Sequence, residues 1–247
     1  MSTDAYKQLL ELVKKRRSTR RFKSDPILDD ILKKIIEVAR WAPSGFDTQP
    51  WDFIILKDKS DRNKIVEITA SYWDDCLEME KARPEWQGKT WDLKGMTNEP
   101  GDYSHAPVYI IMFGDPRVLD ALPMGVQYDS HRKQLIYQSS LTNAFMYMHL
   151  AAASFGIGAQ WYSAVQTPKS ACLIKDYLEI PPEFDIYDMM VLGYPARKPA
   201  KKFLRNLEDM IYWGSNNEGK FRSVPKIQEF VRKGRAWVTG CHSKKSD

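Results

Sequence analysis

Four arginines and two hydroxyl residues are gathered in the segment RRSTRRF, residues 16–22. The guanidinium group of arginine is a planar fork of donors that fits phosphate oxygens, and serine and threonine add neutral donors. A second basic pair, Lys202 and Arg205, follows the motif GYPARKPAK near the C-terminus. Both clusters could bind a phosphate. A basic run is also commonly a solvated surface, and the helix dipole favours basic residues at a helix end, so the residues alone leave both interpretations open.

Polar side chains are also concentrated in the segment APSGFDTQPW, residues 42–51. Pro43 and Pro50 stiffen the backbone on either side, and Gly45 permits close approach to something flat. A stiff loop with donors and acceptors suits the edge of a heteroaromatic ring. The alternative is an ordinary turn with local side-chain hydrogen bonds. The polar residues of this loop are Ser44, Asp47, Thr48 and Gln49.

Two further segments carry aromatic residues that could line a site. In GIGAQWYSAV, residues 156–165, two glycines end a helix and lead into a strand, and we interpret Trp161 and Tyr162 as core or wall residues. Residues 71–104 contain Pro, Gly and charged residues together with Trp73, Trp86 and Trp91. A loop of this length is usually functional or mobile, so we predict a lid; the alternative is that the tryptophans pack the segment on its own subunit.

The elements that must position these motifs alternate along the chain. Apolar residues at helical spacing predict helices at about 4–16, 28–41, 61–81, 131–155, 168–178 and 224–234. Short apolar runs predict strands at about 52–58, 107–115, 158–165 and 186–195. This order indicates one α+β or α/β domain. The predicted buried face of the second helix comprises Ile31, Leu32, Ile35, Ile36, Val38 and Ala39, and the first helix has an apolar stripe of Leu9, Leu12 and Val13.

The composition narrows the class of protein. The chain has 247 residues, 43% hydrophobic and 28% charged, with a net charge of +5. No apolar run approaches the roughly 20 residues that span a bilayer, so we expect no membrane segment. Cys76, Cys172 and Cys241 are far apart, without a CxxC, which predicts no disulfide framework, no metal site and a cytoplasmic protein. The charge fits an anionic small ligand, and the chain lacks a nucleic-acid reader motif, so we expect no nucleic-acid partner.

Together the motifs RRSTRRF, APSGFDTQPW, SFGIGAQWYS and VLGYPARKPAKKFLRNLED resemble the nitroreductase family of flavoproteins, in order and in spacing, over residues 16–212. The resemblance implies an α+β fold with a mostly antiparallel sheet flanked by helices, an intertwined homodimer, and FMN bound in its interface. It also implies an FMN-binding domain at 1–214 and a C-terminal extension at 215–247.

The resemblance assigns the motif residues to parts of the FMN. Arg16, Arg17, Ser18 and Arg20 match the segment that holds the phosphate and ribityl chain, and Lys202 and Arg205 match the basic pair that closes on the same phosphate. The loop that touches the flavin, partly from the partner subunit, corresponds to Pro43, Ser44, Gly45, Asp47 and Gln49. The stretch along the ring corresponds to Tyr162, Ser163 and Ala164.

One position departs from the family's pattern, which commonly has asparagine where this chain has Asp47. Ionised aspartate can only accept hydrogen bonds and opposes negative charge on a reduced flavin. A carboxylate at this position could instead pair with the ring N–H of the flavin or with an arginine. We therefore expect Gln49 to be a more direct ligand of the flavin than Asp47.

The resemblance implies a ping-pong oxidoreductase without catalytic side chains of its own. NAD(P)H would reduce FMN, and a flat small-molecule acceptor such as a nitroaromatic, quinone or enone would then be reduced on the same ring face. The four histidines are scattered, and we interpret each as structural. Three alternatives stay open: another reaction of the family, such as reductive dehalogenation or flavin fragmentation; a flavin-binding protein without turnover; and a non-catalytic anion-binding or nucleic-acid-binding module.

Overall fold

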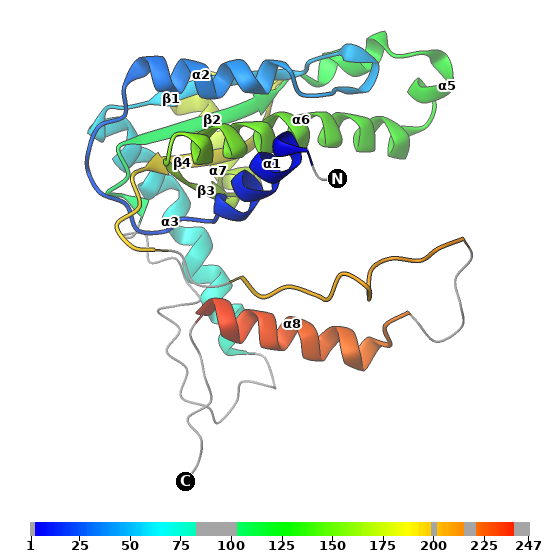
Figure 1. Ribbon diagram of the computed structural model, residues 1–247. Coiled ribbons are helices and arrows are strands. Elements are labelled where there is room, and N and C mark those ends of the chain that lie inside the picture. The colour runs from blue at the N-terminus through cyan, green and yellow to red at the C-terminus, as the bar shows by residue number, and fades with distance from the viewer. Residues whose placement is uncertain (1–2, 83–102, 199–201, 215–220, 240–247) are drawn as a thin grey trace. The chain divides into compact units, whose positions relative to one another are not determined.

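The computed structural model describes residues 3–82, 103–198, 202–214 and 221–239. The chain divides into two compact units, each described here by itself. The first consists of residues 1–78 and 98–198, and the second of residues 79–97 and 199–247. Figure 1 shows the elements of both units.

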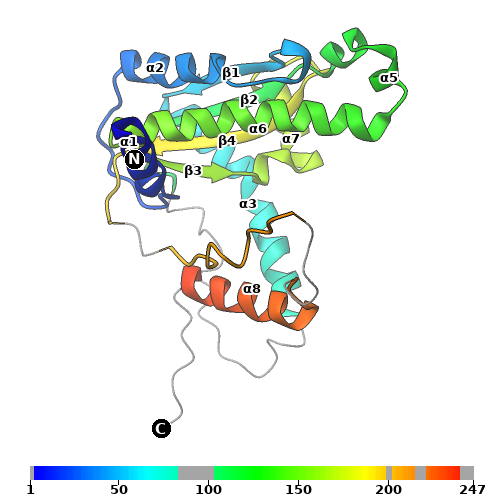
Figure 2. The same ribbon diagram turned by 45° about the vertical axis from the view of Figure 1, so that its right-hand side comes forward.

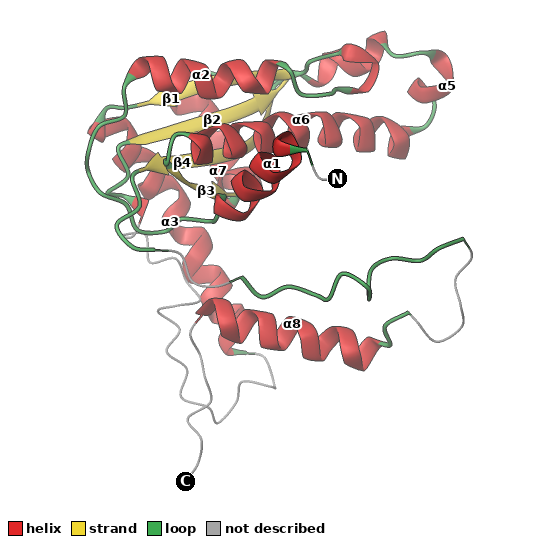
Figure 3. Cartoon of the chain, viewed as in Figure 1, coloured by secondary structure: helices red, strands yellow, loops and turns green. Residues whose placement is uncertain are grey.

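A four-stranded antiparallel sheet is the centre of the first unit (Figure 3). Its strands are β1 (Trp51–Leu56), β2 (Val108–Gly114), β3 (Gly158–Tyr162) and β4 (Asp185–Gly193). Their order in the sheet is β1-β2-β4-β3, and each neighbouring pair is antiparallel. The sequence-based expectation of a mostly antiparallel α+β fold is thus confirmed, and β3 forms one edge of the sheet.

Helices cover both faces of this sheet, which explains why its inner strands β2 and β4 are mostly apolar. On one face lie α2 (Asp29–Arg40) and α6 (Ser130–Ser154), and on the other lie α3 (Lys59–Lys81) and α7 (Pro168–Tyr177) (Figure 1). Successive side chains of a strand point to opposite faces. Accordingly Ile110 and Met112 of β2 pack in the cluster with α2 and α6, whereas Tyr109 and Ile111 pack in the cluster with α3 and α7.

The predicted helix faces are confirmed in part. Leu32, Ile35 and Ala39 of α2 are buried, but Val38 is 38% exposed, because a residue next to Ala39 is turned by about 100° around the helix. The first helix, α1 (Asp4–Lys15), has no buried residue, and the apolar side chains of Leu9 and Val13 stay exposed in the single chain.

Several short elements lie outside the predicted ones. A 3₁₀-helix at Pro116–Ala121 and α5 (Met124–Gln127) connect β2 to α6, and a 3₁₀-turn at Ala164–Gln166 ends β3 earlier than the sequence indicates. In the second unit, α8 (Val224–Thr239) is longer than predicted. None of the helices in the described part of the chain is long and apolar enough to cross a membrane.

Candidate functional site

The basic segment RRSTRRF lies against the edge of the sheet. Ser18 forms a parallel bridge with Ala159 of β3, and the backbone N–H of Thr19 donates to the Ala159 carbonyl at 2.9 Å. Further along, Lys23 N–H donates to the Tyr194 carbonyl at 2.8 Å. The segment is therefore fixed between β3 and the end of β4, directly after α1, which lies beside α6 (Figure 2).

Gly158 makes this close approach possible. A Cβ at position 158 would lie 2.5 Å from Thr19 Oγ1 and 2.8 Å from Thr19 Cβ, distances that a real side chain does not adopt. The glycine that the sequence places at the start of a strand thus also brings the basic segment into contact with that strand.

Three arginines of this segment lack a described carboxylate partner. Within the described ranges, no ion pair is formed by Arg16, Arg17 or Arg20. The pKa of the Arg20 guanidinium is lowered by desolvation, although the residue is exposed overall; arginine nevertheless stays protonated. A partly desolvated cation such as Arg20, without a counter-ion among the described residues, is a group that a bound anion could pair with.

His149 of α6 is a buried side chain within electrostatic range of Arg16. It is 2% exposed, its ring stacks on that of Trp161 with centroids 5.5 Å apart, and neither ring nitrogen has a hydrogen-bond partner in the described chain. Burial, and then the charge of Arg16, lower the pKa of His149 to about 3. We therefore keep the structural interpretation of this histidine.

The loop after α2 holds a backbone that most residues avoid. Phe46, Asp47 and Gln49 have φ angles of 55°, 53° and 43°, in the left-handed region. Such conformations cost energy in residues other than glycine and tend to be retained at functional sites. Three of them within four residues indicate that the loop is held in one shape against its local preference.

The loop is held by its own side chains and by α6. Gln49 N–H donates to Ser44 Oγ at 3.1 Å, and Gln49 Nε2 donates to Asp47 Oδ1 at 3.0 Å. The N–H of Gly45 donates to Ser140 Oγ at 2.9 Å, and Asn143 Nδ2 donates to the Pro43 carbonyl at 3.0 Å. The local turn bonds are thus present, and in this chain Asp47 accepts from the residue predicted to contact the flavin.

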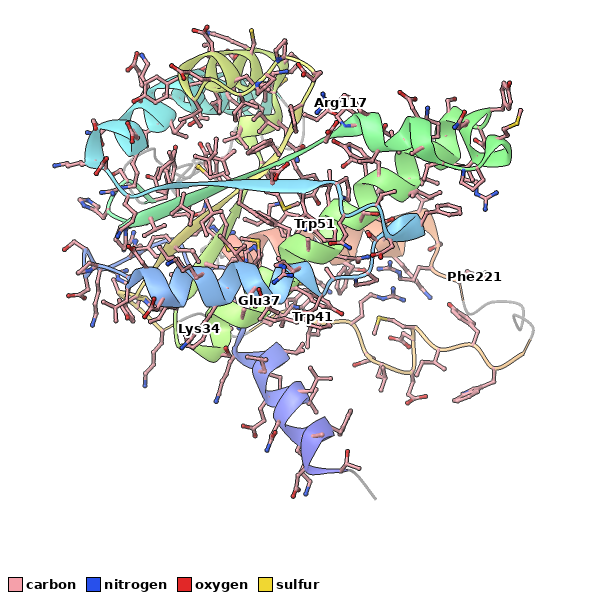
Figure 4. The ribbon with its side chains drawn as sticks, turned by 90° about the horizontal axis from the view of Figure 1, so that it is seen from above. Lys34, Glu37, Trp41, Trp51, Arg117 and Phe221 are labelled. Carbon is pink, nitrogen blue, oxygen red and sulfur yellow. The ribbon has the colours of Figure 1, made fainter. Side chains whose placement is uncertain are left out.

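Large apolar side chains in and next to this loop are exposed to solvent. Phe46 is 54% exposed and Trp41 is 78% exposed. The indole N–H of Trp41 donates to Glu37 Oε1 at 3.2 Å, and Figure 4 shows these two side chains near the end of α2, with Trp51 at the start of β1. No described hydrogen bond joins this loop to the basic segment, and its contact with a partner subunit stays a prediction.

Of the three residues at and just after the end of β3 that are predicted to lie along the ring, only one has an exposed side chain. Tyr162 is 1% exposed, and its hydroxyl group lies 2.8 Å from that of Tyr103 and donates to Thr69 Oγ1 at 3.0 Å. Ala164 is also buried, whereas Ser163 is exposed. Any contact of Tyr162 with a ring is therefore limited to its backbone, and Ser163 is the residue whose side chain can reach a ligand.

Asp188 of β4 is a buried carboxyl group that sequence reasoning missed. It is 2% exposed, and the indole N–H of Trp161 donates to its Oδ2 at 2.5 Å. Burial raises the pKa of Asp188 to about 7, while the side chains of Trp161, Ser163 and Gln166 oppose that shift. A single acidic residue inside the apolar run IYDMMVLG was the available signal.

The C-terminal basic pair belongs to the second unit. Arg205 Nη2 donates to the Asp209 carbonyl at 2.7 Å and lines a cavity of about 310 Å³. The same cavity is lined by further basic residues, Arg222, Lys226 and Lys233, which the sequence motifs did not single out. That Lys202 and Arg205 bind the same phosphate as the basic segment of the first unit stays a prediction. Of the proposed lid residues, Trp86, Trp91 and the side chain of Trp73 lie outside the described residues.

The residues of the first unit fit an FMN in size and chemistry. From Ala159, beside the basic segment, to Tyr162 the strand β3 advances three residues, about 10 Å, and Ser163 follows in the next turn. That is the length scale of a phosphate joined to a tricyclic ring by a five-carbon chain. Cations without an ion pair among the described residues near one end of β3, and an exposed hydroxyl after its other end, match the anionic and ring ends of such a molecule.

Comparisons with known proteins match this architecture. The model of the Nitroreductase family matches residues 13–194. Iodotyrosine deiodinase of Thermotoga neapolitana is 28% identical over 202 residues, 81% of this chain and 95% of that protein. Iodotyrosine deiodinase 1 of Rattus norvegicus is 37% identical over 110 residues, and the match covers 43% of this chain and 36% of the rat protein, about a third of its length.

The fold is shared with solved structures as well. The NADPH:FMN oxidoreductase of Vibrio harveyi, complexed with NAD+, superposes with a TM-score of 0.65 at 19% identity, covering 92% of this chain and 85% of that one. At this identity the likeness concerns the arrangement of helices and strands.

Proposed function

The chain belongs to the nitroreductase family, and from this premise we propose that it is an FMN-dependent oxidoreductase that passes hydride or electrons from NAD(P)H to a flat acceptor. The acceptors that we propose are nitroaromatics, quinones or enones. The observation that carries the proposal is the arrangement along β3, with arginines that form no ion pair with the described residues near its start and exposed Ser163 directly after its end. The name of the Vibrio harveyi protein supports the same cofactor and donor.

In this proposal the chain supplies position and charge. Arg16, Arg17 and Arg20 hold the phosphate by charge-assisted hydrogen bonds, and Ser18 adds a neutral donor. Ser163 offers a hydroxyl group to the edge of the ring. When bound, FMN would supply the hydride and electron chemistry.

We also propose that the working molecule is a homodimer. The apolar stripe of α1 and the exposed Phe46 and Trp41 are not covered by the described residues, and the strained loop 43–49 is anchored on α6 without a described hydrogen bond to the basic segment. Pairing with a second copy would cover these side chains and bring the loop to the partner's FMN. Sedimentation should show a dimer, and a stable monomer that retains FMN would contradict the arrangement.

Reductive dehalogenation is a second candidate, favoured by one observation. The Thermotoga neapolitana relative, named iodotyrosine deiodinase, matches this chain over nearly its own full length. The two candidates separate in a substrate screen with the reduced holoprotein. Release of iodide from a halogenated tyrosine, with nitroaromatics and quinones left unreduced, would replace the first candidate by the second.

The visible absorbance spectrum of the purified protein is the first test. A flavin spectrum, with FMN released into the supernatant on heating, would support the cofactor. Steady oxidation of NADH or NADPH with an added quinone would then exclude a flavin-binding protein without turnover. A colourless protein that fails to bind added FMN would contradict the proposal and favour the anion-binding alternative.

A further inference from the structure

The buried carboxyl group of Asp188 lies next to the one exposed side chain of the ring stretch. The antiparallel register pairs Tyr162 of β3 with Met189 of β4. The next residue of each chain segment in that register is Ser163 on one side and Asp188 on the other. The Asp188 side chain is 2% exposed, whereas Ser163 is exposed. Ser163 is therefore an exposed residue next to a buried acid, and its hydroxyl group is accessible to a ligand.

The two oxygens of this carboxyl group differ. Oδ2 accepts the indole N–H of Trp161 at 2.5 Å, and Trp161 in turn stacks on His149. Oδ1 is buried and forms no hydrogen bond of ordinary geometry with the described residues, although the Ser163 and Gln166 side chains lie close enough to lower the pKa of the acid. A buried polar atom without a partner is costly, so an unpaired carboxyl oxygen needs an explanation.

The groups that face Asp188 contribute no positive charge to it. From β3 there is Trp161, from the following turn Ser163 and Gln166, and from β4 the phenol of Tyr187, whose own pKa Asp188 helps to raise. On the α6 side, the ring of His149 stacks on that of Trp161, and its lowered pKa of about 3 leaves it uncharged near neutral pH. Burial is therefore the dominant effect, none of the described cations contributes to it, and the pKa of the carboxyl group is raised to about 7.

We propose that Asp188 is a positioning residue that sets whether Ser163 presents a donor or an acceptor to the bound ligand. A protonated carboxyl group donates through its O–H to Ser163 Oγ, which leaves the serine hydrogen free to point outward as a donor. An ionised carboxylate accepts that hydrogen instead, and Ser163 then offers only a lone pair outward. One proton on Asp188 thus reverses the hydrogen-bonding character of an exposed hydroxyl group.

This inference rests on the proposed function, because it takes an oxidised flavin as the ligand at Ser163. The ring carbonyls and unprotonated ring nitrogens of oxidised flavin are acceptors, so the donor state of Ser163 binds them better. FMN should consequently bind more tightly when Asp188 is protonated than when it is ionised. We expect a ratio of about 3- to 10-fold, the range of a single net hydrogen bond.

The first arm of the test uses the protein without flavin. Tryptophan labelled with 15N gives one indole N–H resonance per residue, and the Trp161→Phe variant identifies the resonance of Trp161. We expect that resonance to shift between pH 5 and 9 with a midpoint near 7, and to stay fixed in Asp188→Asn. A resonance that does not move over this range would overturn the proposal.

The second arm measures FMN affinity at each pH for the wild type, Asp188→Asn and Ser163→Ala. The phosphate of FMN titrates near pH 6, so the ratio of wild-type to variant affinity is followed, in which that titration cancels. With Asp188→Asn, the ratio should be close to one below pH 6 and fall about 3- to 10-fold by pH 8.5. With Ser163→Ala, FMN should bind without the step near pH 7.

Asp176→Asn is the matched control, because it removes one carboxylate from an exposed position of α7 and should behave as the wild type. A wild-type ratio that stays constant against Asp188→Asn, or a step that persists in Ser163→Ala, would overturn the inference while leaving the proposed function intact. Failure of the wild-type chain to bind any FMN would overturn the proposed function itself.

Discussion

Single side chains of the basic segment carry the clearest prediction about cofactor retention. Arg20→Ala removes a charge-assisted hydrogen bond worth about 1.5–3 kcal/mol, so FMN affinity should fall roughly 10- to 150-fold. Lys34→Ala is the control, because it removes one positive charge from an exposed position of α2, labelled in Figure 4. Fluorescence titration of the apoprotein with FMN measures both. Equal affinity of Arg20→Ala and Lys34→Ala would contradict the phosphate site.

Residue types alone indicated the proposed phosphate-binding residues more clearly than the residues proposed to lie along the flavin ring. The fork geometry of arginine is a property of the side chain itself, so the residues of RRSTRRF suffice to suggest a phosphate site. The burial of Tyr162 and Asp188 depends on which face of β3 and β4 each residue occupies, and on the Trp161 hydrogen bond that joins those strands. Neither is visible in a local sequence pattern.

At the scale of single elements, the strained loop after α2 is predicted to lower the stability of the fold. Phe46 has a φ of 55° and is largely exposed in the single chain, so Phe46→Gly loses little packing within the chain and relieves backbone strain of about 1–2 kcal/mol. Phe46→Ala is the control, because it removes the ring but keeps the Cβ that causes the strain. Thermal unfolding should place Phe46→Gly above Phe46→Ala in Tm. The reverse order would contradict the claim of strain.

The contact between the basic segment and β3 gives a second prediction at this scale. Gly158→Ala places a Cβ 2.5 Å from Thr19 Oγ1, so the segment must move away from the strand. FMN affinity and stability should both fall, and the double variant Gly158→Ala with Thr19→Gly should recover part of each, because the clashing atoms are gone. Differential scanning calorimetry and FMN titration measure the two effects. Absence of any recovery would show that Gly158 acts otherwise.

Periodicity predicted the long elements of the sheet and its helices, including α6 and all four strands, because their apolar spacing reflects the faces they bury. It did not predict the turn at Ala164–Gln166 or the left-handed loop at 46–49. Those shapes come from tertiary hydrogen bonds such as Gly45 to Ser140, which link residues far apart in the sequence.

For the molecule as a whole, two buried titratable groups oppose each other in the pH dependence of stability. The pKa of Asp188 is raised to about 7, so the folded state binds this proton more tightly than the unfolded state, and stability falls as pH rises from about 4 to 7. The pKa of His149 is lowered to about 3, so the unfolded state binds that proton more tightly, and stability rises from about pH 3 to 6.5. Between about pH 4 and 6.5 the two slopes, each about 1.4 kcal/mol per pH unit, cancel.

Removing either group should therefore uncover the slope of the other. Relative to the wild type, Asp188→Asn should gain stability with rising pH, by about 2–3 kcal/mol between pH 4.5 and 6.5, and His149→Phe should lose a similar amount. Urea unfolding of the apoprotein at a fixed protein concentration measures the three curves, and a pH-independent packing cost of the phenylalanine leaves the slope unchanged. Parallel curves for all three proteins would mean that neither group changes its proton affinity on folding. Opposite slopes of stability against pH for the two variants would establish that the fold favours the neutral form of both groups. Asp188 and His149 both contact Trp161, one as an acid and one as a base.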